Sequence, residues 1–205
     1  MRRKSVVAAA VFCSTVLSMS VAFATPPTGD VNYKDYARSE VTDAASVPAT
    51  MGTNLMTGQY SIAPGGETGW RQLPGAMVLA VTKGKLTLRG SDRCDAKDYA
   101  TDQAAVVNAG TYRVENTGNE PLEFFGLFFA QPANAPKPLT EGPTAKAPEN
   151  CSGVSGLAAA DAAPTGVSVD AIAAGTFGHS MFGDPPSLEI HPGKDLFATR
   201  YDFGP

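Results

Sequence analysis

The chain has 205 residues, of which 43% are hydrophobic and 18% charged, and this apolar content is enough for one hydrophobic core. The modest charge excludes an intrinsically disordered chain, and the lack of any period in the 21 glycines and 16 prolines excludes a collagen-like one. The net charge is -4, and the sequence has no basic patch of the kind that would indicate a nucleic-acid partner.

Residues 1–24 have the pattern of an export signal. A basic start at Arg2, Arg3 and Lys4 precedes an apolar run that ends in the small-x-small sequence Ala22-Phe23-Ala24. This pattern predicts a signal peptide cleaved after Ala24 and a mature protein that is extracellular or periplasmic, with no membrane anchor. An uncleaved anchor is the alternative, although the serines and threonines of the run weaken it as a spanning helix.

Export also determines the expected state of the cysteines. Cys13 would leave with the signal peptide, so the mature chain would keep only Cys94 and Cys151. Two cysteines in an oxidising compartment usually pair, and we predict this disulfide. It would close a loop of about 58 residues and stabilise the fold by roughly 4 kcal/mol. Two free thiols are the alternative.

The mature chain opens with a polar N-terminal arm, residues 25–49, and then shows short apolar segments separated by Gly and Asn turns. Residues 76–81 form an unbroken apolar run, typical of a strand buried on both faces. Such spacing predicts an antiparallel all-β sandwich or barrel over residues 50–132. The expected strands cover residues 55–62, 76–81, 85–89, 104–107, 111–115 and 122–130.

Residues 133–166 are rich in Pro, Ala and Gly and are interpreted as a linker. The following segment, 167–205, regains strand-like character. Its end, Leu196–Pro205, matches Leu55–Pro64 at a constant offset of 141, with Leu, Tyr and Pro identical. We therefore interpret 167–205 as a partial second repeat of the domain or as accessory strands. A chance match over ten residues is the alternative.

The sequence from Pro64 to Trp70 and the spacing that follows it resemble the cupin superfamily, in particular small secreted single-domain members, over residues 52–132. The resemblance implies a cupin-like antiparallel jelly-roll β-barrel. Gly65 and Gly84 stand at the family's two glycine positions, and Asn116 at the end of its second motif. All four metal-ligand positions are replaced, by Arg71, Leu73, Met77 and Tyr112.

These four residues are poor metal ligands, so we expect neither a metal nor another cofactor. Arg has donors only, Leu has no polar atom, Met is a weak acceptor and Tyr is a neutral phenol near pH 7. Period-two alternation places them inside the barrel, where Arg71 could meet an anion while Leu73, Met77 and Trp70 supply an apolar wall. The alternative is a filled core in which Glu67 or Asp92 pairs with Arg71. Glu189 and His191 give only weak evidence of a metal site.

The function expected from these features is that of a secreted, metal-free, non-catalytic module that binds a small amphipathic or anionic ligand, or a protein partner. One alternative is a metal-independent cupin enzyme resembling isomerases or epimerases, with Tyr112 as the acid and Arg71 holding an anion. Another is a truncated two-domain cupin without activity. The sequence leaves the ligand and the oligomeric state open.

Overall fold

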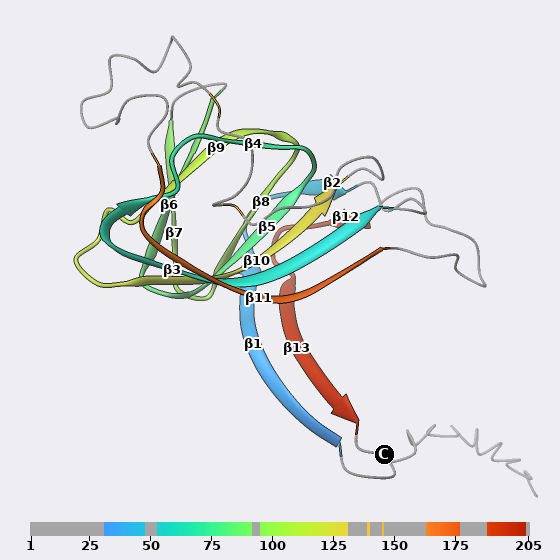
Figure 1. Cartoon of the computed structure of the whole chain (residues 1–205). Coiled ribbons are helices and arrows are strands. Elements are labelled where there is room, and N and C mark those ends of the chain that lie inside the picture. The colour runs from blue at the N-terminus through green and yellow to red at the C-terminus, as the bar shows by residue number, and fades with distance from the viewer. Residues whose placement is uncertain are drawn as a thin grey trace, which may run out of the picture.

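The structure is a computed structural model that describes residues 31–47, 53–91, 95–130, 139, 145, 163–176 and 188–203. The predictions that fall outside these residues are the signal peptide, Asp92 and the Cys94–Cys151 disulfide. Within the described residues the chain forms strands and no helix, so no helix there could span a membrane (Figure 1). The predicted all-β fold class is confirmed.

The described strands follow the chain from the N-terminal arm to residue 203. They are β1 (Val31–Val41), β2 (Ala45–Val47), β3 (Asn54–Glu67), β4 (Arg71–Leu73), β5 (Met77–Lys83), β6 (Lys85–Gly90), β7 (Ala96–Ala100), β8 (Gln103–Val107), β9 (Gly110–Glu115), β10 (Leu122–Ala130), β11 (Thr165–Thr176), β12 (Leu188–Ile190) and β13 (Asp195–Phe203). The six strands expected from the sequence correspond to β3, β5, β6, β8, β9 and β10.

Strand β3 is longer than the apolar pattern predicts. It continues through Pro64 to Glu67, because an irregularity accommodates the proline: Ile62 pairs with Val167 of β11, and Glu67 pairs with Thr165. Gly65 has a φ of +73° at this point, a conformation that glycine adopts at little cost. A turn signal in the sequence is therefore a bulge within one long strand.

The sheet order is β13-β1-β8-β5-β10-β3-β9-β6-β7, with β11 added to β3 and β4 added to β9. Pairing is antiparallel except between β1 and β8. A turn at Gly84, with a φ of +78°, joins β5 to β6, which pair with different neighbours. β5 lies between β8 and β10, whereas β6 lies between β9 and β7, so the sheet curves around an interior (Figure 1).

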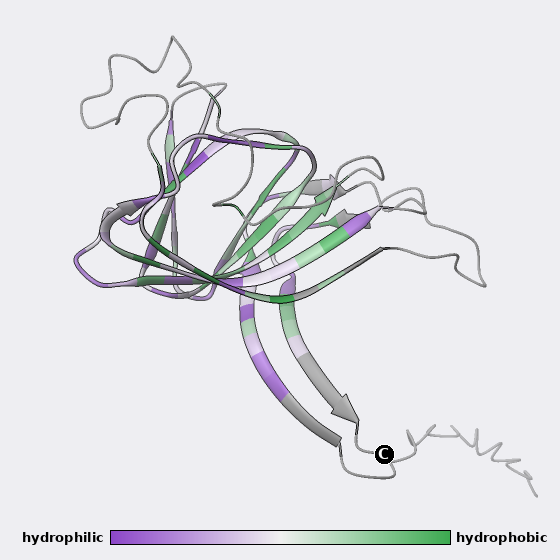
Figure 2. Cartoon of the chain, viewed as in Figure 1, coloured by the Kyte–Doolittle hydropathy of each residue, from purple (hydrophilic) through white to green (hydrophobic). Residues whose placement is uncertain are grey.

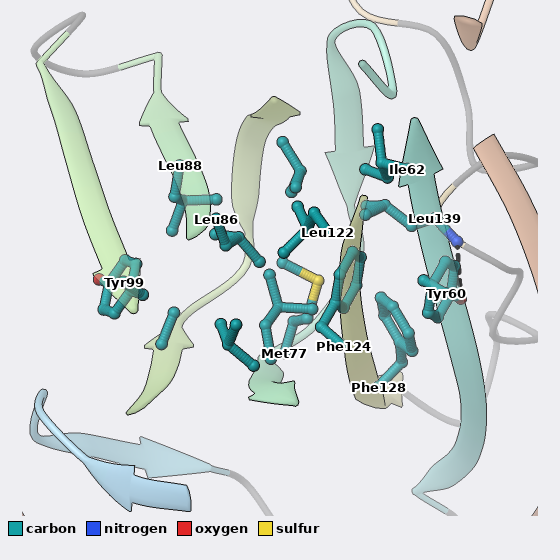
Figure 3. Close-up of a cluster of buried hydrophobic side chains, with 14 of the residues drawn as sticks. Tyr60, Ile62, Met77, Leu86, Leu88, Tyr99, Leu122, Phe124, Phe128 and Leu139 are labelled. Atoms are coloured by element: carbon teal, nitrogen blue, oxygen red, sulfur yellow. Dashed lines mark hydrogen bonds between the residues drawn. The ribbon is translucent and has the colours of Figure 1, made fainter. Parts of the chain in front are cut away.

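Two apolar clusters lie on opposite faces of β5. Met77, Leu79 and Val81 belong to the inner cluster, while Val78 and Ala80 belong to the outer one, as expected for a strand buried on both faces. The inner cluster fills the barrel with side chains from strands on both sides, including a stacked pair formed by the Tyr60 and Phe124 rings, whose centroids are 4.9 Å apart (Figure 3). The barrel interior is thus a packed core.

The predicted linker, 133–166, contacts the barrel at Leu139 and Ala145, and its last two residues begin β11. The side chain of Leu139 is 1% exposed within the inner cluster, and its N–H donates to the Tyr60 hydroxyl at 3.2 Å (Figure 3). The N–H of Ala145 donates to the carbonyl of Trp70 at 3.0 Å. The sequence pattern did not predict the Leu139 contact, because an isolated leucine among prolines and alanines forms no periodic apolar pattern.

The N-terminal arm contains a strand that the sequence pattern did not predict. β1 pairs with β13 along its length, with a register shift between Asp35 and Ala37. This bulge disrupts the period-two pattern by which a strand is recognised. The β1–β13 ribbon extends from the barrel (Figure 1), and the base of β13 is apolar (Figure 2).

The segment that copies the start of β3 is also a strand, as expected, and it stands at the end of the sheet order, beyond β1. Its partner is the N-terminal arm, and Leu196 and Ala198 pack against the outer cluster. The second piece of the arm, β2, pairs with β12. Segments from both ends of the described chain therefore cover the outer face of β5, β8 and β10.

Candidate functional site

The structure brings together residues from both halves of the cupin resemblance. In the antiparallel pair β4–β9, Arg71 lies opposite Tyr112 and Leu73 lies opposite Gly110. Opposite residues of a pair share one face of the sheet. A Cβ at Gly110 would lie 3.0 Å from the Tyr112 ring, so the glycine leaves the space that this ring occupies.

This face of β4 and β9 adjoins the inner cluster. Leu73 and Met77 are members of the cluster, and the half-buried Tyr112 packs against it. Trp70 is 3% exposed, and within the described part of the chain its indole Nε1 has no hydrogen-bond acceptor. Leu73, Met77 and Tyr112 therefore meet at the inner cluster, and Arg71 lies opposite Tyr112, whereas Trp70 is buried but is not a member of this cluster.

Arg71 is 4% exposed, and its Nε donates to the Thr68 carbonyl at 2.9 Å. Burial lowers the pKa of this guanidinium. The Thr68 side chain is itself fixed, because its hydroxyl accepts from the N–H of Val114 at 3.0 Å. A buried cation is thus held in a defined position beside β9.

The suggestion that Glu67 pairs with Arg71 is wrong for the described contacts. The carboxylate of Glu67 forms an ion pair with Arg113 instead, on the next strand. The reason is register: Glu67 lies opposite Glu115 in the β3–β9 pair, and Arg113, two residues from Glu115, lies on the same face of β9. The other suggested partner, Asp92, lies outside the described residues.

The donor set does not fit a divalent metal ion. Arg71, Leu73, Met77 and Tyr112 together offer a thioether and a neutral phenol, and both are weak ligands for iron, manganese or zinc. Among the described residues, no group of three His, Cys, Asp or Glu side chains could hold a metal. His191 is exposed at the end of β12, and the side chain of Glu189 is not described.

Asn116, the last position of the second motif, has a structural role. It is 1% exposed, and its Nδ2 donates to the carbonyls of Ile62 and Glu120 at 2.9 and 2.8 Å. Its Oδ1 accepts from the N–H of Gly118 at 3.0 Å. These bonds fix the turn between β9 and β10 against β3, so the residue stabilises the fold.

A buried ion cluster on the other face of β9 was not apparent from the sequence. Arg113 contacts Glu67 and lies 3.0 Å from Glu115, and Arg89 lies 2.8 Å from the same carboxylate. The side chain of Arg113 is only 4% exposed. Charges alternating with apolar residues, as in Arg113-Val114-Glu115, ordinarily indicate a solvent-facing strand face, so the pattern carries no signal of burial.

A second polar contact ties the arm to β7. The Tyr99 hydroxyl donates to Asp43 at 2.8 Å, and Lys97 forms an ion pair with the same carboxylate. Burial would raise the pKa of Asp43, but the bonds from Lys97 and Tyr99 lower it overall. Burial raises the pKa of Tyr99, and the bond to Asp43 raises it further.

The Tyr99→Phe variant is expected to lose about 1.5–2 kcal/mol of stability at pH 7, because its hydrogen bond to a carboxylate is removed. The pKa of Asp43 is lowered from its ordinary value of 3.8 in the folded protein. The ionised Asp43 carboxylate therefore stabilises the fold fully above pH 3.8, and this stabilisation is lost as the pH falls through the lowered pKa. The difference from wild type should therefore shrink in strong acid. Urea unfolding at pH 7, 5 and 2.5 measures it, with Tyr36→Phe as the control. An equal loss at every pH would contradict the assignment.

Comparisons with known proteins concern the fold alone. A scan against family models finds no match, and a search of curated proteins finds no significant one. An RmlC-like cupin family protein with a double-stranded β-helix fold from Methanocaldococcus jannaschii is 16% identical, with a TM-score of 0.37, and the match covers 45% of this chain and 84% of that one. A cupin domain from Bordetella pertussis is 17% identical, with a TM-score of 0.34, over 44% and 96%. A protein from Bacillus halodurans is 26% identical, with a TM-score of 0.36, over 41% and 68%.

Proposed function

We propose that the mature chain is a secreted, metal-free and non-catalytic cupin-like module that binds a small amphipathic anion at the inner face of β4 and β9. The observation that carries this proposal is the juxtaposition of Arg71 and Tyr112, which lie directly opposite each other beside Leu73. A fixed guanidinium attracts a carboxylate or phosphate, and a neighbouring phenol can donate one further hydrogen bond.

The environment of this pair favours an amphipathic ligand over a fully polar one. Tyr112 is half-buried and packs against the inner cluster, of which Leu73 is a member, so the body of a ligand beside Tyr112 would meet apolar side chains. Because the inner cluster fills the barrel interior, we place the ligand at the β4–β9 wall and not at the centre of the barrel. Catalysis is not proposed, because neither Arg71 nor Tyr112 is a general base near pH 7.

The proposal is tested by calorimetric titration of phenylacetate, with neutral 2-phenylethanol as the matched compound. Phenylacetate is expected to bind the wild type and to bind Arg71→Gln at least ten-fold more weakly, because the charge-assisted contact is lost. Arg38→Gln is the control, since the side chain of Arg38 is 71% exposed and lies on β1. Circular dichroism verifies that both variants are folded.

Equal phenylacetate affinities of the wild type and Arg71→Gln would contradict an anion site at this position. Elemental analysis of the purified protein addresses the other part of the proposal. About one transition-metal ion per chain would contradict the metal-free proposal, because side chains other than Arg71, Leu73, Met77 and Tyr112 would then have to bind the metal.

A further inference from the structure

A groove of about 440 Å³ opens between the β1–β13 ribbon and the outer face of the barrel. Phe125 and Leu127 of β10 and Ile172 of β11 line its barrel side, while Tyr36 and Phe197 line its ribbon side. The volume and the aromatic and aliphatic lining are those of binding sites in general. This groove is separate from the Arg71–Tyr112 pair.

The ribbon side of the groove includes β13, which stands at the end of the sheet order. β13 pairs with β1 along one edge, and among the described strands it has no partner along the other. Residues 197–199 of β13 line the groove. An edge strand presents alternate N–H and C=O groups, which favour pairing with a further extended chain. The groove therefore combines an apolar floor with backbone donors and acceptors along its side.

Phe197 of β13 also lines the groove. It is 61% exposed, and no other large apolar side chain in the described part of the chain is classed as exposed. The guanidinium of Arg38 lies over its ring, 5.1 Å from the centroid, and this stacking supports the ring on the ribbon. An exposed aromatic residue beside an unpaired strand edge is a feature of interaction surfaces.

The match between residues 196–203 of β13 and residues 55–62 of β3 indicates what kind of neighbour the unpaired edge of β13 could accept. Leu55–Ile62 of β3 is paired on both edges by antiparallel ladders, one with β10 and one with β11, and the β11 ladder has a register shift between Ala171 and Ala173. Its copy, 196–203, has only β1 as a partner among the described strands. A strand added to the other edge of β13 would continue the β1–β13 ladder in the way that β10 and β11 flank β3.

The charges around the groove favour a neutral occupant. Lys34 lies 4.7 Å from the centroid of the Tyr36 ring, and Arg38 pairs with Asp195 at 3.0 Å. Asp35 accepts a hydrogen bond from Thr199. No charged side chain belongs to the described lining of the groove. A strongly charged segment would gain nothing here.

We propose that this groove binds an extended, uncharged peptide segment of a partner protein, which adds as a strand to the free edge of β13. Side chains at alternate positions of the peptide pack on Phe125, Leu127 and Ile172, while its backbone pairs with residues 197–199. This is β-strand addition, in which main-chain hydrogen bonds give affinity and alternate side chains give selectivity. The proposal is independent of the function proposed above.

The probe is the uncharged peptide acetyl-Ser-Thr-Val-Thr-Val-Thr-Ser-amide, and its matched control is the same peptide with N-methyl groups on alternate residues, which removes ladder donors. In heteronuclear NMR titrations of the full mature chain, amide shifts are expected to be largest at residues 196–199. Phe197→Ser is expected to weaken binding at least five-fold, whereas Gln72→Ser, at an exposed position on β4, should leave it unchanged. Since Phe197 is mostly exposed, its replacement should not unfold the chain.

Three outcomes would overturn the proposal. If the methylated peptide binds as well as the probe, the groove accepts apolar groups without strand pairing. If neither peptide shifts the β13 amides, the edge does not bind extended chains. If the wild type sediments as a dimer that Phe197→Ser converts to a monomer, a second copy of this chain occupies the edge instead.

Discussion

The Arg113→Met variant is expected to be less stable than the wild type by about 3–5 kcal/mol at pH 7, because it leaves buried carboxylates without their cation. Arg113 contacts Glu67 and Glu115, whose side chains are only 10% and 11% exposed. Burial lowers the pKa of Arg113, while the Glu115 charge opposes this shift. Methionine keeps much of the side-chain volume, so the loss reports on charge more than on packing.

Lys83→Met supplies the matched control for this prediction. Lys83 also forms an ion pair, with Glu123 at 3.7 Å, but the side chains are 51% and 36% exposed. Exposed pairs of this kind contribute about 0–1 kcal/mol. Urea unfolding of both variants gives the comparison, and a double variant, Arg113→Met with Glu67→Gln, should recover part of the loss. If Arg113→Met costs no more than Lys83→Met, solvent reaches the cluster and the assigned burial is wrong.

The sequence predicted the strands whose side chains follow simple patterns. Residues 76–81 are apolar throughout and form most of β5, which is buried on both faces as expected. Residues 85–89 alternate and lie within β6. Arg71 and Tyr112, expected on different strands, lie on β4 and β9. In these places local pattern and tertiary environment coincide, so the pattern is informative.

The remaining features depend on contacts between distant segments. β7 was not predicted because Tyr99 is its only buried residue, and one apolar position has no period. The bulge in β1 interrupts the regular pairing of the arm, and Leu139 reaches the core from a segment whose composition is that of a linker. The partner of Glu67 follows from the register between β3 and β9, which a single sequence does not specify.

Gly75→Ala is the second variant for which a large loss is expected, because a Cβ at this position would overlap the backbone carbonyl oxygen of Phe129. Gly75 lies in the turn between β4 and β5, and the adjacent Ala76 carbonyl accepts from the Phe129 N–H at 2.9 Å. The methyl group can be accommodated only if this hydrogen bond opens or the end of β10 moves. We expect a loss of about 3 kcal/mol or more.

Gly65→Ala distinguishes this steric effect from the conformational cost of replacing a glycine. Gly65 has a φ of +73°, but a Cβ there would have no atom within 4 Å, so the expected loss is only about 1–2 kcal/mol. Urea unfolding gives the two free energies, and hydrogen exchange at the Phe129 amide reports whether the end of β10 opens. Gly75→Ala should speed this exchange by at least ten-fold, whereas Gly65→Ala should accelerate it only as far as the lower global stability requires. Only close backbone contact makes Gly75 more sensitive than Gly65. Equal losses of unfolding free energy in the two variants, with the Phe129 amide still protected, would therefore show that the turn is not packed against β10.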